Sequence, residues 1–278
     1  MTMPAVSRAA LFQMTTGIDP VVNAAAIVAA VAEAKAGGAV MLFTPEMSGL
    51  LDRKRDRAAA SIVGESEDRV LAAVREAASR EGLWVHIGSL AIRPEEGDGR
   101  YANRAFVIDD TGEIRARYDK MHMFDVDLAT GESWRESNAY APGDKVVTVE
   151  TPLGLLGLAI CYDVRFPALF EALGRAKCDV IATPAAFTVP TGKAHWHLMQ
   201  RARAVEASAF VLSAAQVGQH EDGRETYGHS LAIDPWGDVL LDMGGDKAGL
   251  GFVDLDPVRI QEVRAQLPSL ANRRTIAK

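Results

Sequence analysis

The sequence predicts an α/β protein in which helices cover one face of each of two sheets. Apolar runs of strand length alternate with segments whose apolar residues recur at helical spacing, and hairpin-like pairs interrupt this alternation. No repeat and no linker divides the chain, so we expect one domain over residues 1–278.

The first part of the chain shows both kinds of segment. Asp19 and Pro20 supply an N-cap and a first-turn proline, and Ile27, Val31 and Ala34 mark one face of the helix that follows. This helix should end at the two glycines at 37 and 38, and a second helix is predicted over 67–80. The strands predicted here are 9–15, 40–43, 83–92, 104–108 and 113–118.

The middle of the chain contains a polar, irregular segment over 124–145. A loop of this length is usually functional or disordered, and because it contains Glu136 we expect it to form a wall of the active site. Regular elements then resume. The strands predicted there are 146–150, 155–160, 180–183, 210–214, 231–233, 239–242 and 251–254, and the helices are 168–176, 194–207 and 257–266.

Composition excludes several classes of partner. The net charge of −7 argues against nucleic acid and anionic membrane surfaces. No apolar run approaches the roughly 18 residues of a membrane span, and the apolar stretch after Arg8 is too short for a signal-peptide core. Only Cys161 and Cys178 are present, which is no disulfide framework. We therefore expect a cytoplasmic protein.

Three strand-like runs each end in a chemically useful side chain. The run before Cys161 delivers a thiol to a polar break followed by the start of a helix, where partial positive charge favours a thiolate. The run before Glu46 delivers a carboxylate, and Lys120 stands among aromatic and sulfur side chains. Taken singly, these residues could be a buried apolar thiol, a rim carboxylate and a surface lysine. Together they could meet in one pocket of an α/β sheet.

These segments resemble the nitrilase superfamily of carbon–nitrogen hydrolases. The matching motifs are P-E at Glu46, K-M-H at Lys120, E-S-N at Glu136 and C-Y-D-V-R-F at Cys161, in the order and spacing of the family. The resemblance covers roughly residues 8 to 275. It implies a four-layer αββα sandwich that commonly pairs through its helices, so we expect a homodimer or a higher homo-oligomer.

The resemblance also implies the chemistry. Cys161 would attack the amide carbon, and Glu46 would take the thiol proton and pass it to the departing amine. Lys120 and the backbone N–H of Tyr162 would bind the oxyanion, and Glu136 would hold Lys120 or the attacking water. Lys120 and the helix start should lower the pKa of Cys161. Burial should raise the pKa of Glu46, with Lys120 opposing that rise.

Specificity is expected to depend on residues near the cysteine. Arg165, four residues beyond it, could clamp a substrate carboxylate with its two-pronged guanidinium group. An ion pair between Arg165 and Asp163 is the structural alternative. Phe187 and Thr191, in the loop after the strand over 180–183, resemble family positions that line the acyl pocket.

No metal and no cofactor is expected. His195 and His197 invite a metal site, but in a helix residues i and i+2 lie about 200° apart, so the two cannot face one ion. Arg203 and Glu206 have the spacing of a salt bridge on one helix face, which we favour over a phosphate site. The four tryptophans are expected to be core or interface anchors.

Further segments resemble the deaminated glutathione amidase and ω-amidase branch of the superfamily. They are H-W at 195–196, R-A-R-A-V-E at 201–206, A-A-Q-V-G-Q-H at 214–220 and Y-G-H-S at 227–230, extending to D-P-W-G at 234–237. The predicted reaction is therefore hydrolysis of a small amide that bears a carboxylate, through a cysteine thioester and with release of ammonia. An N-carbamoyl amino acid hydrolase, or a catalytically silent interaction module on the same fold, remains the alternative.

Overall fold

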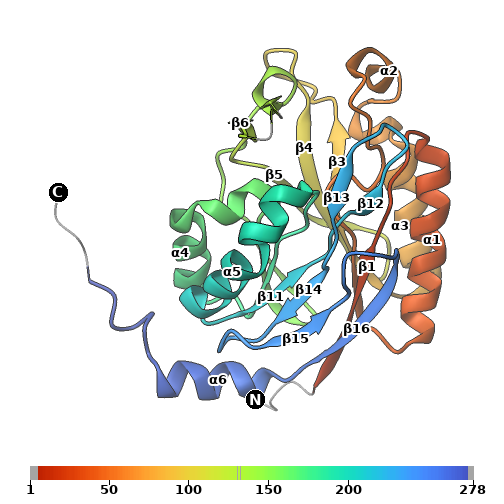
Figure 1. Ribbon diagram of the computed structural model, residues 1–278. Helices are drawn as coiled ribbons and strands as arrows, with labels where there is room; N and C mark the ends of the chain where they lie inside the picture. The colour runs from red at the N-terminus through yellow and green to blue at the C-terminus, as the bar shows by residue number, and fades with distance from the viewer. Residues whose placement is uncertain (1–5, 130, 132, 275–278) are drawn as a thin grey trace.

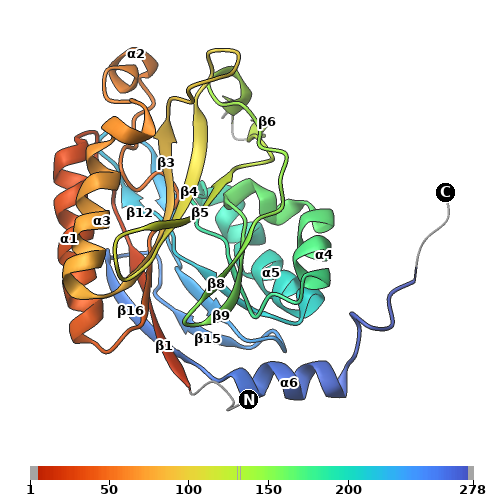
Figure 2. The same ribbon diagram turned by 180° about the vertical axis from the view of Figure 1, so that it is seen from behind.

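Two sheets packed face to face form the centre of the molecule, and helices cover their outer faces (Figures 1 and 2). The computed structural model describes residues 6–129, 131 and 133–274. The first sheet is covered by α1 (Pro20–Ala36) and α3 (Arg69–Glu81), which lie side by side. The second is covered by α4 (Pro167–Arg175) and α5 (Val189–Ala207). This order of layers confirms the predicted αββα sandwich.

Each sheet has a parallel centre and antiparallel edges. Its central strands are joined by helical crossovers, whereas hairpin-like neighbours close the edges. The first sheet has the order β16 (Gly249–Leu255), β1 (Ser7–Gln13), β2 (Met41–Phe43), β3 (Trp84–Ile92), β4 (Ala102–Ile108) and β5 (Ile114–Asp119). The second has the order β15 (Val239–Asp242), β14 (Leu231–Ile233), β11 (Phe210–Ser213), β10 (Val180–Ala182), β9 (Gly154–Leu158) and β8 (Thr148–Thr151).

Alternation along the strands builds both cores. In β1, Ala9 and Leu11 join the core between the sheets, and Ala10 joins the core under α1 and α3. Successive side chains of a strand point to opposite faces, so a strand buried on both faces is apolar throughout.

Caps fix the ends of the helices. The side chains of Asp19 and Asp68 accept hydrogen bonds from the N–H groups of Val21 and Leu71 at the starts of α1 and α3. Gly82 ends α3 in the left-handed conformation. Among the described residues, no helix combines the length and the apolar composition that crossing a membrane requires. The other helices are α2 (Arg55–Ala59) and α6 (Pro257–Gln266), which lies along the lower end of the molecule in Figure 1.

Gly88 lets the two sheets approach each other. A Cβ at this position would lie 2.1 Å from the carbonyl oxygen of Thr44, which follows β2, and 2.5 Å from the Cβ of Pro184, which follows β10. No side chain fits at such distances. The loops after β2 and β10 therefore meet across the interface between the sheets.

Helix α5 is longer than predicted. The sequence predicts a helix over 194–207, but α5 begins at Val189, so Thr191 lies in its first turn and not in a loop. Pro190 suits a first turn because no donor is needed there. Gly192 weakens the helical signal, yet it is required, since its Cβ would lie 2.2 Å from the ring of Tyr227.

Other predicted boundaries differ by a few residues. The strand predicted over 9–15 ends at Gln13, the last residue of its ladder with β16. The helix predicted over 67–80 begins at Arg69, because Asp68 is its N-cap. Boundaries depend on pairing and capping, which apolar periodicity does not record.

Several short elements were missed. They lack an apolar run long enough to show a period. Thr130 and Glu132, within the segment predicted as irregular, lie outside the described residues. The missed elements are α2, the pair β6 (Asp125–Asp127) and β7 (Ser133–Arg135), and the pair β12 (Val217–Gln219) and β13 (Glu225–Tyr227).

Candidate active site

The four residues predicted to form the active centre lie together, although they come from both sheets. Glu46 follows β2, Lys120 follows β5, and Glu136 begins a 3₁₀ turn in the loop after β7. Cys161 follows the second sheet, where it begins a 3₁₀ turn, Cys161–Arg165, three residues after the end of β9. All four line one cavity of about 860 Å³.

Lys120 lies between the two carboxylates. Its Nζ donates to Glu46 Oε1 at 2.8 Å and to Glu136 at 2.9 Å (Oε2) and 3.0 Å (Oε1). Asn103 Nδ2 donates to the same two carboxylates, at 2.9 Å to Glu46 and 3.1 Å to Glu136. The N–H of Phe124 also donates to Glu136, at 2.6 Å. The buried charges are thus both paired and hydrogen-bonded, as burial of charge requires.

Mutual attraction keeps Glu46 and Lys120 ionised. Burial raises the pKa of Glu46, but the charge of Lys120 and hydrogen bonds from Cys161, Lys120 and Asn103 outweigh it, so the pKa lies below its ordinary value. Burial likewise lowers the pKa of Lys120, but the charges of Glu136 and Glu46 hold it well above the ordinary value. The predicted rise in the pKa of Glu46 is therefore wrong in net direction, because the opposing effect of Lys120 is the stronger.

Cys161 combines a raised pKa with an unusual backbone conformation. Its φ is 50°, in the left-handed region, and its N–H donates to the carbonyl of Pro184 at 2.8 Å. Burial, followed by the charge of Glu46, raises the pKa of Cys161 well above its ordinary value, although Lys120 opposes this. The predicted lowering of this pKa is therefore wrong. The thiol hydrogen-bonds the Glu46 carboxylate.

Asp163 fastens the turn that begins with the cysteine. Its fully buried carboxylate accepts from the Tyr118 hydroxyl at 2.7 Å, from the N–H of Ile160 at 2.9 Å and from the N–H of His122 at 3.0 Å. His122 Nδ1 lies 2.7 Å from it as well. These groups occupy the carboxylate, and Arg165 is not among its partners in the described residues.

Arg165 stands beside the cavity wall. Its guanidinium carbon lies 5.7 Å from the ring centroid of Tyr162 and 5.5 Å from that of Phe187, and its Nη1 lies 3.3 Å from His195 Nδ1. Tyr162, Phe187 and Thr191 line the cavity, whereas Arg165 does not. Arg165 therefore lies outside the cavity lining, against two rings that form part of its wall.

Other cationic side chains line the cavity directly. Two of them, Arg53 and Arg224, lie with their guanidinium carbons 5.8 Å and 5.4 Å from the ring of Trp134. Trp134 thus lines the cavity and does not belong to the core of the molecule. The arginines that line the cavity are Arg53, Arg55, Arg100, Arg135 and Arg224.

Sequence reasoning missed two groups that hold Glu46. Asn103 bridges the two carboxylates, and its signal was a polar residue at the start of a buried strand. The N–H of Ala186 donates to Glu46 Oε2 at 3.0 Å. A backbone donor carries no signature in its side chain, so no sequence pattern could have found it.

The residues of α5 that were singled out have different partners. His195 faces Arg165 and His197 faces Asp242, as expected from their angular separation. Arg203 pairs with Glu206 at 2.6 Å, which confirms the predicted salt bridge, and it also donates to the Val164 carbonyl at 2.8 Å. Helix α5 thereby holds the turn that carries Cys161.

The family model for carbon–nitrogen hydrolases matches residues 8–265, nearly the whole chain. The chain belongs to this family. It is 40% identical over 205 residues to the deaminated glutathione amidase of Yersinia enterocolitica, a match that covers 73% of this chain and 71% of that protein. Family and relatives together make the chain an amidase.

Solved structures agree with this assignment. The C. elegans NitFhit protein superposes with a TM-score of 0.90 and 31% identity, over 98% of this chain and 66% of that one. An amidase mutant from Nesterenkonia sp. superposes with a TM-score of 0.77 and 27% identity, over 94% of this chain and 98% of that one. In that structure acrylamide has added to the active site cysteine.

Proposed function

We propose that this amidase hydrolyses a small amide bearing a carboxylate, such as a 2-oxo acid ω-amide or deaminated glutathione, through a thioester on Cys161. The observation that carries the proposal is the Lys120 ammonium between Glu46 and Glu136, with the Cys161 thiol on Glu46 and all four on one cavity. The relative from Yersinia, named a deaminated glutathione amidase, supports the choice of substrate.

Acylation begins with a proton transfer. Cys161 enters the reaction as a thiol, and Glu46 takes its proton as the sulfur–carbon bond forms. The positive charge of Lys120 keeps the Glu46 carboxylate ionised at neutral pH, so Glu46 can accept the thiol proton. The electron pair of the carbonyl moves to oxygen, where a tetrahedral oxyanion forms.

Lys120 and the backbone N–H of Tyr162 stabilise this oxyanion. Lys120 is preorganised, because Glu46 and Glu136 hold its ammonium from two sides. Removing one such donor typically costs about 2.7–4 kcal/mol of transition-state stabilisation. Glu136 acts by positioning Lys120.

Collapse of the intermediate completes the cycle. Glu46 gives the proton to the departing nitrogen, the carbon–nitrogen bond breaks, and ammonia leaves a thioester behind. Water then attacks the thioester while Glu46 takes one of its protons, and the acid is released as the thiol re-forms. Every step uses side chains and backbone groups of this chain, so no cofactor enters the reaction.

Arg165 supplies the recognition of the substrate carboxylate in this proposal. Its guanidinium group lies over two rings that line the cavity, and Asp163, its alternative partner, is occupied by Tyr118 and His122. A bidentate guanidinium–carboxylate contact is charge-assisted and specific for planar anions.

Ammonia release from a panel of amides tests the proposal. Arg165→Lys should lower kcat/KM for acidic amides by roughly tenfold or more, while neutral aliphatic amides, poor substrates of the wild type, change little. Arg175→Lys, a change in an exposed ion pair on α4, is the matched control. Failure to release ammonia from any amide would refute the function. A proportional loss on all amides, together with a lower thermal midpoint, would refute the role of Arg165 alone.

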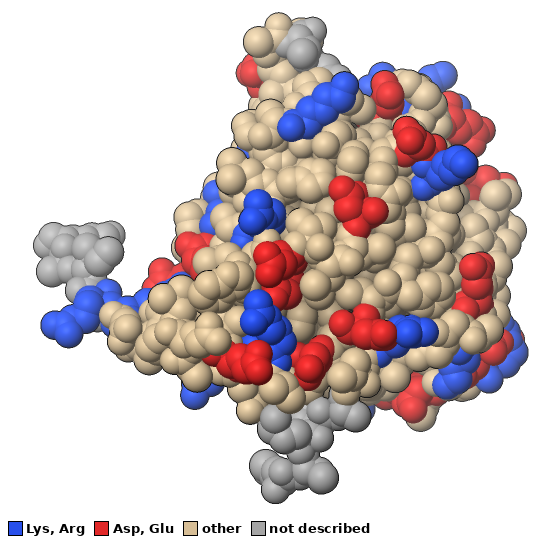
Figure 3. Space-filling view, turned by 60° about the horizontal axis from the view of Figure 1, so that its bottom comes forward, with Lys and Arg blue, Asp and Glu red and all other residues tan. Residues whose placement is uncertain are grey.

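We further propose that the chain forms a homodimer through the exposed face of α5 and β15. Large apolar side chains are exposed there. Figure 3 shows acidic and basic residues in small groups, separated by uncharged areas, on the face that it turns to the viewer. The exposed apolar residues at this proposed interface are Leu198, Val205, Trp236, Val239 and Leu240. Sedimentation of the Leu198→Glu variant as a monomer would support this interface.

We also propose a cytoplasmic location, which the two free cysteines and the lack of a disulfide between them fit.

A further inference from the structure

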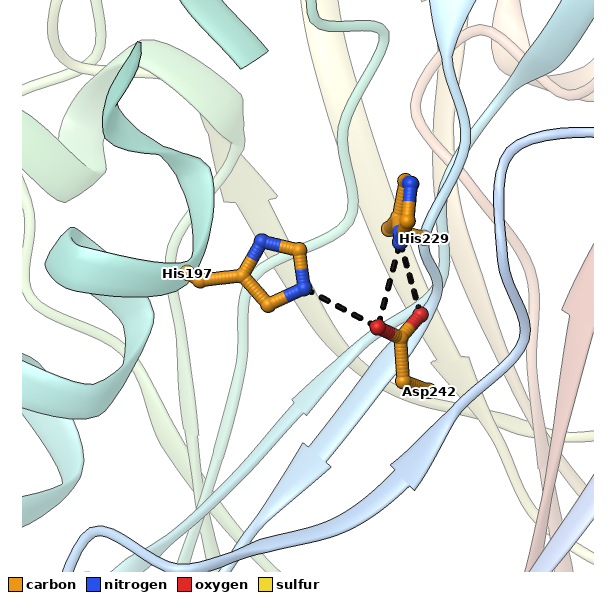
Figure 4. A group of neighbouring side chains, drawn as sticks. All are labelled: His197, His229 and Asp242. Atoms are coloured by element: carbon orange, nitrogen blue, oxygen red, sulfur yellow. Dashed lines mark hydrogen bonds and ion pairs between the residues drawn. The ribbon is translucent and has the colours of Figure 1, made fainter. Parts of the chain in front are cut away.

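Outside the cavity, two histidines converge on one carboxylate (Figure 4). His197 comes from α5, His229 from the connection between β13 and β14, and Asp242 from the end of β15. His197 Nε2 lies 3.0 Å from Asp242 Oδ2, and His229 Nδ1 lies 2.8 Å from Asp242 Oδ1 and 3.1 Å from Oδ2. None of the three lines the cavity.

The spacing of these atoms suits a metal ion. One ligand atom from each residue lies within 4.8 Å of the other two. In a tetrahedral site with bonds of 2.0–2.2 Å, ligand atoms lie about 3.3–3.6 Å apart. The histidine–carboxylate contacts need to open by only about 0.5 Å to reach that spacing. The ligand atoms of the two histidines, which lie within 4.8 Å of each other, have to reach the same spacing.

The chemistry of the three ligands selects a class of ion. Two neutral imidazoles and one carboxylate favour a divalent transition metal of intermediate softness, and Zn²⁺ takes this set with three protein ligands and an open fourth position. All three side chains are partly exposed, so water can reach that position. Mg²⁺ and Ca²⁺ prefer sites built from oxygen alone.

Neighbouring groups hold the three ligands in place. The ring of His229 stacks on Tyr227 at a centroid distance of 4.4 Å. The backbone carbonyl of His229 accepts a hydrogen bond from Trp196 Nε1 at 2.7 Å. Asp242 Oδ1 accepts from the N–H of Gly244 at 2.9 Å. Such outer contacts orient the ligands of metal sites.

The backbone of His229 lies in an uncommon conformation. Its φ is 54°, in the left-handed region that costs energy for a residue with a side chain. A glycine or asparagine would adopt this conformation at lower cost.

We propose that His197, His229 and Asp242 bind one Zn²⁺ ion, with water as the fourth ligand, and that the ion fastens α5 to the end of β15. The sequence excluded an ion shared by His195 and His197, but the fold provides His197 with other partners. The site is independent of the proposed amidase chemistry, because it lies among residues that do not line the cavity.

Calorimetric titration of the full-length protein with Zn²⁺, after dialysis against a chelator, tests the site. We expect one ion per chain, and His197→Gln, His229→Asn and Asp242→Asn should each weaken binding by about 100-fold or more, beyond the 10–100-fold cost of losing an outer contact. Asparagine is chosen at 229 because it tolerates the left-handed backbone. His195→Gln, on the same helix, and Cys161→Ala are controls that should bind as the wild type does.

Two further readouts separate a metal site from a hydrogen-bonded cluster. Co²⁺ should give the visible absorption of a four-coordinate site without a thiolate charge-transfer band, and Zn²⁺ should raise the thermal midpoint of the wild type but not of His197→Gln. Chelation should leave ammonia release unchanged. Absence of stoichiometric binding, binding that survives Asp242→Asn and His197→Gln, or binding lost in Cys161→Ala would each overturn the proposal.

Discussion

Two groups of three ionisable side chains in this molecule have similar contact distances but opposite surroundings. In the first, Lys120, Glu46 and Glu136 have side chains that are 2%, 6% and 14% exposed. In the second, His197, His229 and Asp242 are 35%, 24% and 34% exposed. Contacts of 2.8–3.0 Å occur in both.

Burial makes the loss of a partner far more costly in the first group than in the second. A charge left without its partner in the interior keeps its full desolvation cost, whereas water replaces a missing partner at the surface. The buried group can therefore hold fixed protonation states for chemistry. His197, His229 and Asp242, near the surface, can exchange their mutual hydrogen bonds for bonds to an ion at little cost in free energy.

The largest effect is expected at the thiol that the buried group surrounds. Cys161→Ala should abolish turnover, since loss of a nucleophile in a concerted catalytic set lowers kcat by about a million-fold. Cys178→Ala should keep turnover near normal, because Cys178 is a fully buried packing residue below β9. Ammonia release measures both. An equal loss in the two variants would contradict the assignment of the nucleophile.

Next in size is the removal of the central cation. Lys120→Met leaves two adjacent carboxylates buried without a counter-charge, so the free energy of unfolding should fall by about 3–5 kcal/mol and turnover should be lost. Lys145→Met removes an exposed lysine and should change neither quantity appreciably. Chemical denaturation measures the stabilities. If Lys120→Met left the free energy of unfolding unchanged, the buried group would not differ from the surface group in the cost of losing a charge.

The smallest effect, counted per pH unit, concerns a third setting, a buried histidine without partners among the described residues. Both ring nitrogens of His86 lack hydrogen-bond partners in the described structure, and burial lowers the pKa of His86 to about 3. Between pH 6.5 and about 3 the unfolded chain therefore binds one proton more than the folded protein. The contribution of His86 to the free energy of unfolding should therefore fall as the pH falls, by about 1.4 kcal/mol per pH unit.

Replacing that ring tests the sign of the effect. His86→Leu should flatten the pH dependence of the free energy of unfolding over this window, whereas His195→Leu, at the surface, should leave the slope as in the wild type. Denaturation curves at several pH values compare the three proteins. An unchanged slope in His86→Leu would show that the ring is hydrated or paired in solution.

Elements were predictable where an apolar pattern was long enough to repeat, or where a proline or a turn motif marked their ends. The helix 257–266 was placed correctly from its proline start, and the strands 231–233 and 239–242 from the turn motif that joins them. The three-residue strands 125–127 and 217–219 were missed, since so short a segment shows no period and neither was recognised from a neighbouring turn. The first turn of α5 was missed because Gly192 is there for packing against Tyr227, a contact that only the tertiary structure reveals.

The active site, too, was predictable only in part. Glu46, Lys120, Glu136 and Cys161 were expected together from the motifs, and the structure brings them onto one cavity. The direction of the pKa shift of Cys161 was not predictable, because it depends on how completely the folded chain excludes water. The meeting of His197 with His229 and Asp242 depends on the packing of α5 against β15, which sequence spacing does not encode.

The raised pKa of Cys161 also bears on how the thiol reacts with oxidants. Peroxides attack a thiolate and not a thiol, and damage proceeds from sulfenic to irreversible sulfinic and sulfonic acids. Burial and the charge of Glu46 keep this sulfur protonated in the free enzyme. In the mechanism proposed above, Cys161 becomes a thiolate only while Glu46 withdraws its proton, so the same raised pKa would slow attack by oxidants between turnovers.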